Sequence, residues 1–203
     1  MPTETVYGLG ANAFDPDACM SIFTAKGRPL TDPLIVHVYS VEQALTLIDQ
    51  KQENAEMVMT IFKELAGQYW PGPMTIVVKA NLDLIPSLIT AETGFVGIRM
   101  PNSPVALELL KAANVPVAAP SANKFGHVSP SKAQHVYDDF HKDCSVTILD
   151  GGACSFGIES TVLKIEDFKK EEDVALEDYK QGANLLILRR GGVSAQSLQA
   201  HVD

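Results

Sequence analysis

Hydrophobic and polar residues recur with two different spacings along the chain. Asp15 followed by Pro16 has the pattern of an N-cap and a first-turn proline, which predicts a helix through Ala25. The apolar run LIVHV at residues 34–38 has the length and composition of a buried strand. The first elements that we expect are therefore a helix and a strand.

Four further segments carry helical signals. The clearest has Met57, Ile61 and Leu65 four residues apart, which places them on one face of a helix. The predicted helices follow the capping-box pattern Ser40 to Gln43, span residues 53–69, and follow Ser103-Pro104 and Ser129-Pro130.

Six short apolar runs have the length of strands. They are TIVVK (75–79), FVGIRM (95–100), VPVAA (115–119), SVTILD (145–150), STVLKI (160–165) and NLLILRR (184–190). Some of these runs follow each other too closely for a crossover helix, so parallel and antiparallel pairs must both occur. The fold class expected is α/β, a single domain with a twisted mixed sheet flanked by helices.

Composition limits the classes of protein to consider. The 203 residues are 46% hydrophobic and 20% charged, which is enough for one compact core. No apolar stretch approaches the roughly 20 residues of a membrane helix, and no signal peptide is visible. Three cysteines without metal or disulfide spacing are expected to be reduced, so we expect a cytoplasmic protein with no membrane contact.

The charge balance argues against a surface that grips nucleic acid everywhere. The formal net charge is −9, and much of the excess lies in the run from Glu166 to Asp178, which we interpret as a solvated loop. A local basic cleft remains compatible with this net charge.

A glycine motif near the start raises the possibility of a dinucleotide site. Residues 8–13, GLGANA, match G-x-G-x-x-A, and Asp32 lies about where a ribose carboxylate would be needed. The motif requires a full strand before its first glycine and a helix that opens inside it, and neither signal is present. The five histidines show no ligand spacing, so no built-in metal site is expected.

Cationic and hydroxyl side chains gather at predicted strand ends and in the loops that follow them. They are Lys26 and Arg28 after the first helix, Arg99, Ser121 and Asn123, Ser160, and the pair Arg189-Arg190. Open α/β sheets bind ligands at such places, and several cations near hydroxyls favour a polyanion such as a nucleoside triphosphate. Taken singly, each has a structural alternative, because basic residues complement helix dipoles and serines cap helices.

Eight motifs in order resemble those of the YrdC/Sua5 family, the threonylcarbamoyl-AMP synthases of tRNA modification. They are PTETVYGLGANA, KGRPLTDPLIVHV, WPGPMTIVV, VGIRMPNSP, APSAN, GHVSPS, GIESTVL and ILRRGG. The resemblance implies a YrdC-like catalytic domain over residues 1–193 with a concave ligand cleft, and a tail or linker over residues 194–203. In the family a strand and a helix usually precede PTETVYGLG, so we expect these to be missing here.

The resemblance also implies a reaction. Members of the family join L-threonine, bicarbonate and ATP, with Mg²⁺ on the phosphates, to give threonylcarbamoyl-adenylate and pyrophosphate. Downstream tRNA threonylcarbamoyl-transfer proteins then modify adenosine 37 of tRNAs that read ANN codons. A carbamate and a triphosphate are both anionic, so their reaction needs cations and hydrogen-bond donors at the phosphoryl oxygens.

Site residues follow from the matched motifs. The ATP site would comprise Lys26, Arg28, Asp32, Ser121, Asn123, Ser129 and Arg190, with Lys26 and Arg28 as the catalytic cations. The threonine site would comprise Thr5, His37, Arg99 and Ser160, with Thr3 and Tyr7 in the same loop as Thr5. Asp32 stands where the family pattern commonly has asparagine, and a carboxylate could contact phosphate only through water or Mg²⁺.

A different class of function also has to be considered. The family fold has been described as a binding module for double-stranded RNA or tRNA, which would need no catalysis. The net acidity disfavours this alternative, although the cationic cleft could make a weak contact with tRNA phosphates.

Overall fold

A seven-stranded mixed sheet organises the protein. The computed structural model describes residues 1–142, 145–167 and 183–202. The strands are β1 (Ala11–Asn12), β2 (Ile35–His37), β3 (Met74–Lys79), β4 (Phe95–Arg99), β5 (Val117–Ala118), β6 (Thr161–Asp167) and β7 (Ala183–Arg189). Their spatial order is β1-β5-β2-β4-β3-β6-β7. The β2–β4 and β3–β6 pairs are parallel and the other neighbours are antiparallel, which confirms the predicted mixed sheet.

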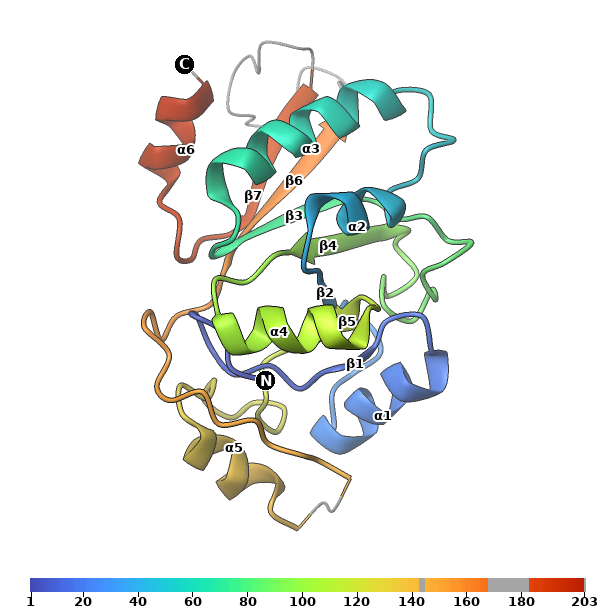
Figure 1. Ribbon diagram of the computed structural model, residues 1–203. Helices are drawn as coiled ribbons and strands as arrows, with labels where there is room; N and C mark the ends of the chain where they lie inside the picture. Colours follow the sequence, from blue (N-terminus) through green and yellow to red (C-terminus); the bar gives the residue numbers. More distant parts are fainter. Residues whose placement is uncertain (143–144, 168–182, 203) are drawn as a thin grey trace.

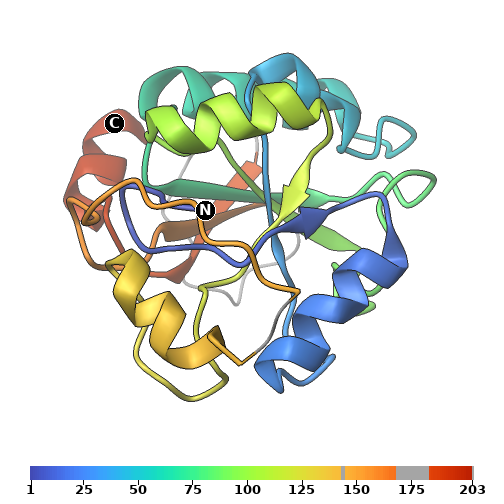
Figure 2. The same ribbon diagram turned by 60° about the horizontal axis from the view of Figure 1, so that its bottom comes forward.

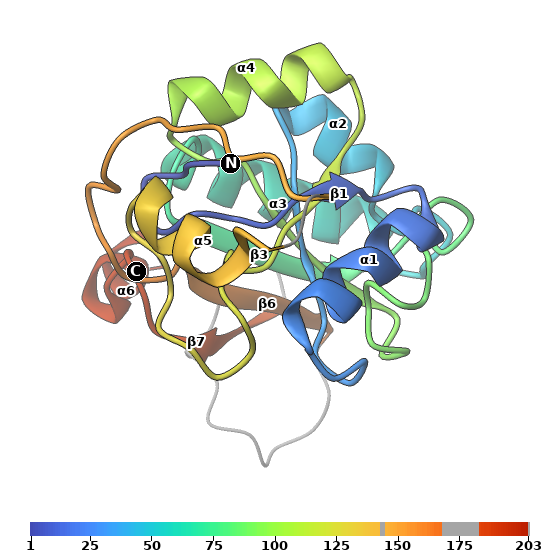
Figure 3. The ribbon, with the colours of Figure 1, turned by 90° about the horizontal axis from the view of Figure 1, so that it is seen from below.

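Helices lie on both sides of this sheet (Figures 1 and 2). They are α1 (Pro16–Lys26), α2 (Val41–Thr46), α3 (Ala55–Tyr69), α4 (Pro104–Ala113), α5 (Ala133–Phe140) and α6 (Ala195–Val202). Figure 2 shows α2, α3 and α4 on one side of the strands and α1 and α5 on the other, and Figure 3 labels the same elements as seen from below. The sheet is therefore the middle layer of a single α/β domain.

The predicted caps of the early helices are present. The Asp15 carboxylate accepts hydrogen bonds from the amides of Asp17 and Ala18 at 2.9 and 3.1 Å, which satisfies two free donors at the start of α1. Gly27 ends the helix in the left-handed region at φ 66°. Two local sequence signals thus set where α1 starts and where the chain leaves it.

Alternation along the strands separates a packed face from an open one. One set of side chains joins the main core with Val58, Ile61, Phe62 and Leu65 of α3: Val36, Ile76, Val78, Val96, Ile98, Leu163 and Ile165. The residues between them face the other way and line a cavity: Ile35, His37, Thr75, Val77, Gly97, Arg99, Val162 and Lys164. Because successive side chains of a strand point to opposite faces, the same strands build the core and the cavity floor.

Three expectations need correction or restriction. SVTILD at residues 145–150 is not a strand: Val146 and Ile148 pack against a small cluster around Tyr7 and Phe140, and no strand among the described residues pairs with the segment. The alternating burial of residues 145–150 therefore comes from packing on this cluster and not from hydrogen bonding to a neighbouring strand. The helix predicted after Ser129-Pro130 begins only at Ala133, and most of the predicted acidic loop, residues 168–178, lies outside the described residues.

Candidate functional site

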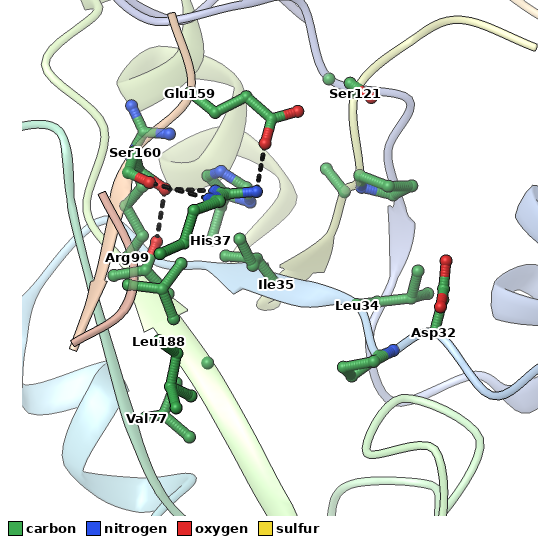
Figure 4. Close-up of a pocket in the computed structure, with 18 of the residues that line it drawn as sticks. Asp32, Leu34, Ile35, His37, Val77, Arg99, Ser121, Glu159, Ser160 and Leu188 are labelled. Carbon is green, nitrogen blue, oxygen red and sulfur yellow. Dashed lines mark hydrogen bonds and ion pairs between the residues drawn. The ribbon is translucent and has the colours of Figure 1, made fainter. Parts of the chain in front are cut away.

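The open face of the sheet carries a cavity of about 750 Å³ (Figure 4). Its floor comes from β2, β3, β4, β6 and β7, and its walls come from the N-terminal segment and the loops after α1, β5 and before β6. Seven of the sequence-predicted site residues line it: Thr5, Arg28, Asp32, His37, Arg99, Ser121 and Ser160. Residues more than 150 positions apart in the sequence therefore line the same cavity.

Arg99 and His37 lie side by side on the floor, because β2 and β4 pair in parallel with His37 opposite Arg99. Arg99 is 4% exposed, and its Nη2 lies 2.7 Å from Oε1 of the equally buried Glu4. Its Nε donates to the carbonyl of Gly72 at 3.2 Å. Burial lowers the pKa of Arg99 and Glu4 opposes this shift, so the guanidinium remains charged.

His37 is a neutral polar group in the cavity. Burial lowers its pKa to about 3, and the nearby Arg99 charge acts in the same direction. Its Nδ1 is buried and has no hydrogen-bond partner among the described residues. A neutral imidazole in this position can exchange a hydrogen bond with a ligand without adding charge.

Thr3 and Thr5 form a hydrogen-bonded pair at the cavity wall. The two hydroxyl oxygens are 2.9 Å apart, and the Thr3 hydroxyl donates to the carbonyl of Val6 at 2.6 Å. With its proton used on Val6, Thr3 must accept the proton of the Thr5 hydroxyl. The Thr5 oxygen is then left with lone pairs and selects a hydrogen-bond donor, such as an ammonium or a hydroxyl group.

A second polar network lies where β6 meets β7. The Ser160 hydroxyl is 2.8 Å from that of Thr75 and accepts a hydrogen bond from Arg189 Nη2 at 3.1 Å. Arg189 also pairs with the carboxylate of Glu159, which accepts a hydrogen bond from the Ser129 hydroxyl at 3.1 Å. Figure 4 shows Ser160 and Glu159 connected through these contacts. The network fixes an arginine, a carboxylate and a hydroxyl at one side of the cavity.

Arg28, Asp32 and Ser121 line the opposite side. Arg28 donates through Nη2 to the carbonyl of Pro33 at 3.1 Å, and the same nitrogen lies 3.7 Å from Asp32 Oδ2. These contacts hold the guanidinium in the loop directly after α1. At 3.7 Å and with Asp32 partly in solvent, the ion pair itself contributes little stability.

Lys26 lies outside the lining and supports it. Its Nζ donates to the carbonyls of Ser121 and Asn123, and its side chain is buried. Burial, followed by the nearby Arg28 charge, lowers the pKa of Lys26 to about 8. The ammonium therefore ties the end of α1 to the loop after β5.

The structure places four predicted residues outside the lining. Lys26, at the end of α1, and Asn123, in the loop after β5, are buried, and Asn123 Nδ2 donates to the carbonyls of Lys124 and His127 at 2.8 Å. Ser129 contacts Glu159, and Arg190 is exposed. Tyr7, in the N-terminal loop, turns away and donates through its hydroxyl to the carbonyl of Gly152 at 2.6 Å.

Sequence reasoning missed several residues that the fold brings to the site. Glu159 and Thr75 line the cavity and were not singled out, and Arg189, named only as one of a cationic pair, lines it in place of its neighbour Arg190. Strand pairing of Arg189 with Val162 provides the reason, because it sets Arg189 beside Ser160 at the start of β6. The sequence signal for Glu159 was present in GIESTVL, but a single acidic residue before a strand has no distinctive pattern.

The described residues contain neither a cluster of metal-ligating side chains nor a helix suited to a membrane. No three His, Cys, Asp or Glu side chains gather there in the way that a metal site needs. In the same part of the chain, no helix combines the length and the apolar character required to cross a bilayer.

Comparisons with known proteins agree with the motifs. The family model Sua5_yciO_yrdC, described as telomere recombination, matches residues 1–177. The threonylcarbamoyl-AMP synthase of Pyrococcus abyssi is 45% identical over 167 residues, which are 82% of this chain and 46% of the relative. That of Bacillus subtilis is 40% identical over 207 residues, with 100% and 53% covered. The chain spans about half the length of these curated relatives.

Solved structures give the same result. P. abyssi Sua5 complexed with L-threonine has a TM-score of 0.81 and 40% identity, with 98% of this chain and 52% of that chain covered. Escherichia coli YciO has a TM-score of 0.71 at 20% identity, with 97% and 84% covered, which shows the fold alone. The predicted α/β fold is thereby confirmed, and the chain belongs to the Sua5/YciO/YrdC family.

Proposed function

We propose that this protein is an enzyme that makes threonylcarbamoyl-AMP and pyrophosphate from L-threonine, bicarbonate and ATP. The observation that carries the proposal is one cavity of about 750 Å³ on the open face of the sheet, which has a buried arginine beside a neutral histidine and two further arginines at its sides. Relatives at 40–45% identity named threonylcarbamoyl-AMP synthase support the same reaction.

One part of the cavity suits an amino acid. Arg99 can pair with a carboxylate, and the Thr5 hydroxyl oxygen can accept a hydrogen bond from an amine or a hydroxyl group. His37 offers a neutral polar contact. These three residues, with Ser160, are the threonine-binding residues of the proposal.

The remaining cations suit a triphosphate. The amine of threonine combines with bicarbonate to give a carbamate with loss of water, and the carbamate oxygen then attacks the α-phosphate while the bond to pyrophosphate breaks. Arg28 and Arg189 lie where they can neutralise the charge that develops on phosphoryl oxygens, and Ser121 adds a hydroxyl donor. In this proposal Lys26, Asn123, Ser129 and Arg190 complete the nucleotide site when ATP is bound.

Mg²⁺ would enter with ATP as part of that substrate. Asp32 and Glu159 are the carboxylates of the cavity lining, and oxygen atoms are the ligands that Mg²⁺ prefers. Asp32 is 41% exposed at its side chain and therefore able to contact the ion through water. The adenylate product would then pass to tRNA threonylcarbamoyl-transfer proteins, with at most a weak contact between this chain and tRNA.

The proposal is tested by incubating the protein with ATP, Mg²⁺, bicarbonate and labelled threonine. We expect a labelled adenylate and pyrophosphate release that depends on threonine. Because the adenylate is unstable, pyrophosphate is followed in parallel. Salt-dependent retention on RNA without any nucleotide turnover would contradict the proposal and favour the RNA-binding alternative.

A further inference from the structure

Glu4 is a buried carboxylate directly beside the cavity. It is 6% exposed and lies between Thr3 and Thr5, which line the cavity, whereas Glu4 does not. Its backbone carbonyl accepts a hydrogen bond from the amide of Phe156 at 2.9 Å. This bond helps to fix the backbone at Glu4, and the carboxylate contacts a residue of the cavity lining through Arg99.

The side chains of Glu4 and Arg99 form an isolated buried ion pair. Arg99 Nη2 lies 2.7 Å from Glu4 Oε1, and both side chains are 4% exposed. Both carboxylate oxygens of Glu4 are buried without a hydrogen bond of good geometry to any described residue. A buried carboxylate is costly unless a charge compensates it, so the placement of Glu4 depends on Arg99.

Two contacts restrict the Arg99 guanidinium. Its Nε donates to the Gly72 carbonyl at 3.2 Å, and its Nη2 faces Glu4. A guanidinium is planar and carries five donors, so fixing two of its nitrogen atoms fixes the direction of the remaining donors. Arg99 itself lines the cavity, so these donors are available to a ligand there.

We propose that Glu4 is a positioning residue that holds Arg99 in the orientation that recognises the carboxylate of the amino-acid substrate. The inference rests on the proposed function. It also explains the charge of the site: Glu4 and Arg99 together are neutral, and a zwitterionic amino acid is neutral as well. Binding therefore leaves no uncompensated charge in the buried part of the cavity.

The experiment measures L-threonine, L-threoninamide and ATP binding by calorimetry on the whole protein. We expect Glu4→Gln to weaken threonine binding about tenfold or more, because the charge that orients Arg99 is lost. Glu4→Asp keeps the charge and should stay within about threefold of the wild type. Threoninamide, which lacks the carboxylate, and ATP should bind all variants equally. Glu56→Gln, an exposed change of the same kind on α3, is the control.

A double-mutant cycle with Arg99→Gln separates a positioning role of Glu4 from a general loss of structure. If Glu4 acts through Arg99, adding Glu4→Gln to Arg99→Gln should not weaken threonine binding further. The double variant contains no unpaired buried charge, so its threonine binding can still be measured if either single variant does not fold. An additive loss, unchanged or tighter threonine binding by Glu4→Gln, or an equal loss for threoninamide or ATP would overturn the inference.

The wild-type protein distinguishes this inference from the proposed function. If the wild-type protein neither binds threonine nor releases pyrophosphate, both the proposed function and the role of Glu4 are contradicted. If the wild-type protein does both and Glu4→Gln binds threonine equally well, only the role of Glu4 is contradicted.

Discussion

At the scale of single residues, the site depends on which charged groups can reach a ligand. Arg28 reaches the cavity, whereas Lys26, two positions earlier, is turned toward the carbonyls of Ser121 and Asn123. The two cations of one short motif therefore have different environments. We expect them to respond differently to substitution and to pH.

Arg28→Ala should slow threonine-dependent pyrophosphate release. If the guanidinium neutralises phosphoryl oxygens in a partly desolvated cavity, its loss should raise the barrier by roughly 2–4 kcal/mol, about 30- to 1,000-fold in rate. Arg28→Lys should recover only part of the rate, because an ammonium lacks the planar pair of donors. A folded Arg28→Ala variant with a near-normal rate would remove Arg28 from the active site.

Lys26 should make ATP binding depend on pH. Its pKa of about 8 means that it loses its charge as the pH rises above 8, so the Kd for ATP should increase there. Calorimetric titration at several pH values between 7 and 9.5 measures the effect. In Lys26→Met this increase should be absent.

Unfolding at high pH would not explain such a result. The unfolded chain keeps the Lys26 proton up to about pH 10.5, so the contribution of this group to folding stability rises between pH 8 and 10.5. A Kd for ATP that is constant from pH 7 to 9.5 in the wild-type protein would contradict the role of the Lys26 charge.

At the scale of elements, α1 places Lys26 and Arg28 at its C-terminal end, whereas its N-terminal end carries the Asp15 cap. The Asp15 cap fixes where the helix starts, and Gly27 in the left-handed region turns the chain so that Arg28 can enter the cavity loop. The cap and the site are therefore at opposite ends of one helix, and stability at the cap can be changed without touching the site.

Asp15→Ala should lower the free energy of unfolding by about 1 kcal/mol, because two amides at the start of α1 lose their acceptor. Asp15→Asn retains a capping oxygen and should be much less affected. Denaturant unfolding measures both changes, and pyrophosphate release by the folded variants should be unchanged. An Ala variant as stable as the wild type would show that water replaces the cap without cost.

At the scale of the whole molecule, the sheet connects core and cavity. Phe62 of α3 is fully buried and packs edge-on against Trp70, with ring centroids 5.3 Å apart. Both belong to the core on the face of the sheet opposite the cavity. Packing on this face should therefore determine stability, while the other face determines binding.

Phe62→Ala should lower the free energy of unfolding by about 3–5 kcal/mol through lost burial and the space that is left. Leu82→Ala, at a side chain that is 58% exposed, is the control and should change it by no more than about 0.5 kcal/mol. Below the melting transition, the threonine Kd of Phe62→Ala should match that of the wild type. A Kd that weakens along with stability would mean that the core and the cavity floor are coupled.

Local signals in the sequence determined much of the fold. The Asp15 and Ser103 caps, the apolar spacing of α3 and the apolar runs of β3, β4, β6 and β7 act over a few residues, and each element formed where it was predicted. The motifs also identified the family and named seven residues that line the cavity. These properties depend on short-range patterns, which a single sequence displays directly.

The strand partners and the contacts between distant residues are not contained in those local patterns and depend on the tertiary structure. Residues 145–150 alternate like a strand but pair with no strand in the part of the chain that the structure describes, and the pairing of β6 with β7 places Arg189 rather than Arg190 in the cavity. The contact between Glu4 and Arg99 joins positions 95 residues apart in the chain. Strand partners and buried ion pairs form between segments distant in sequence, and their geometry depends on how the whole sheet is assembled.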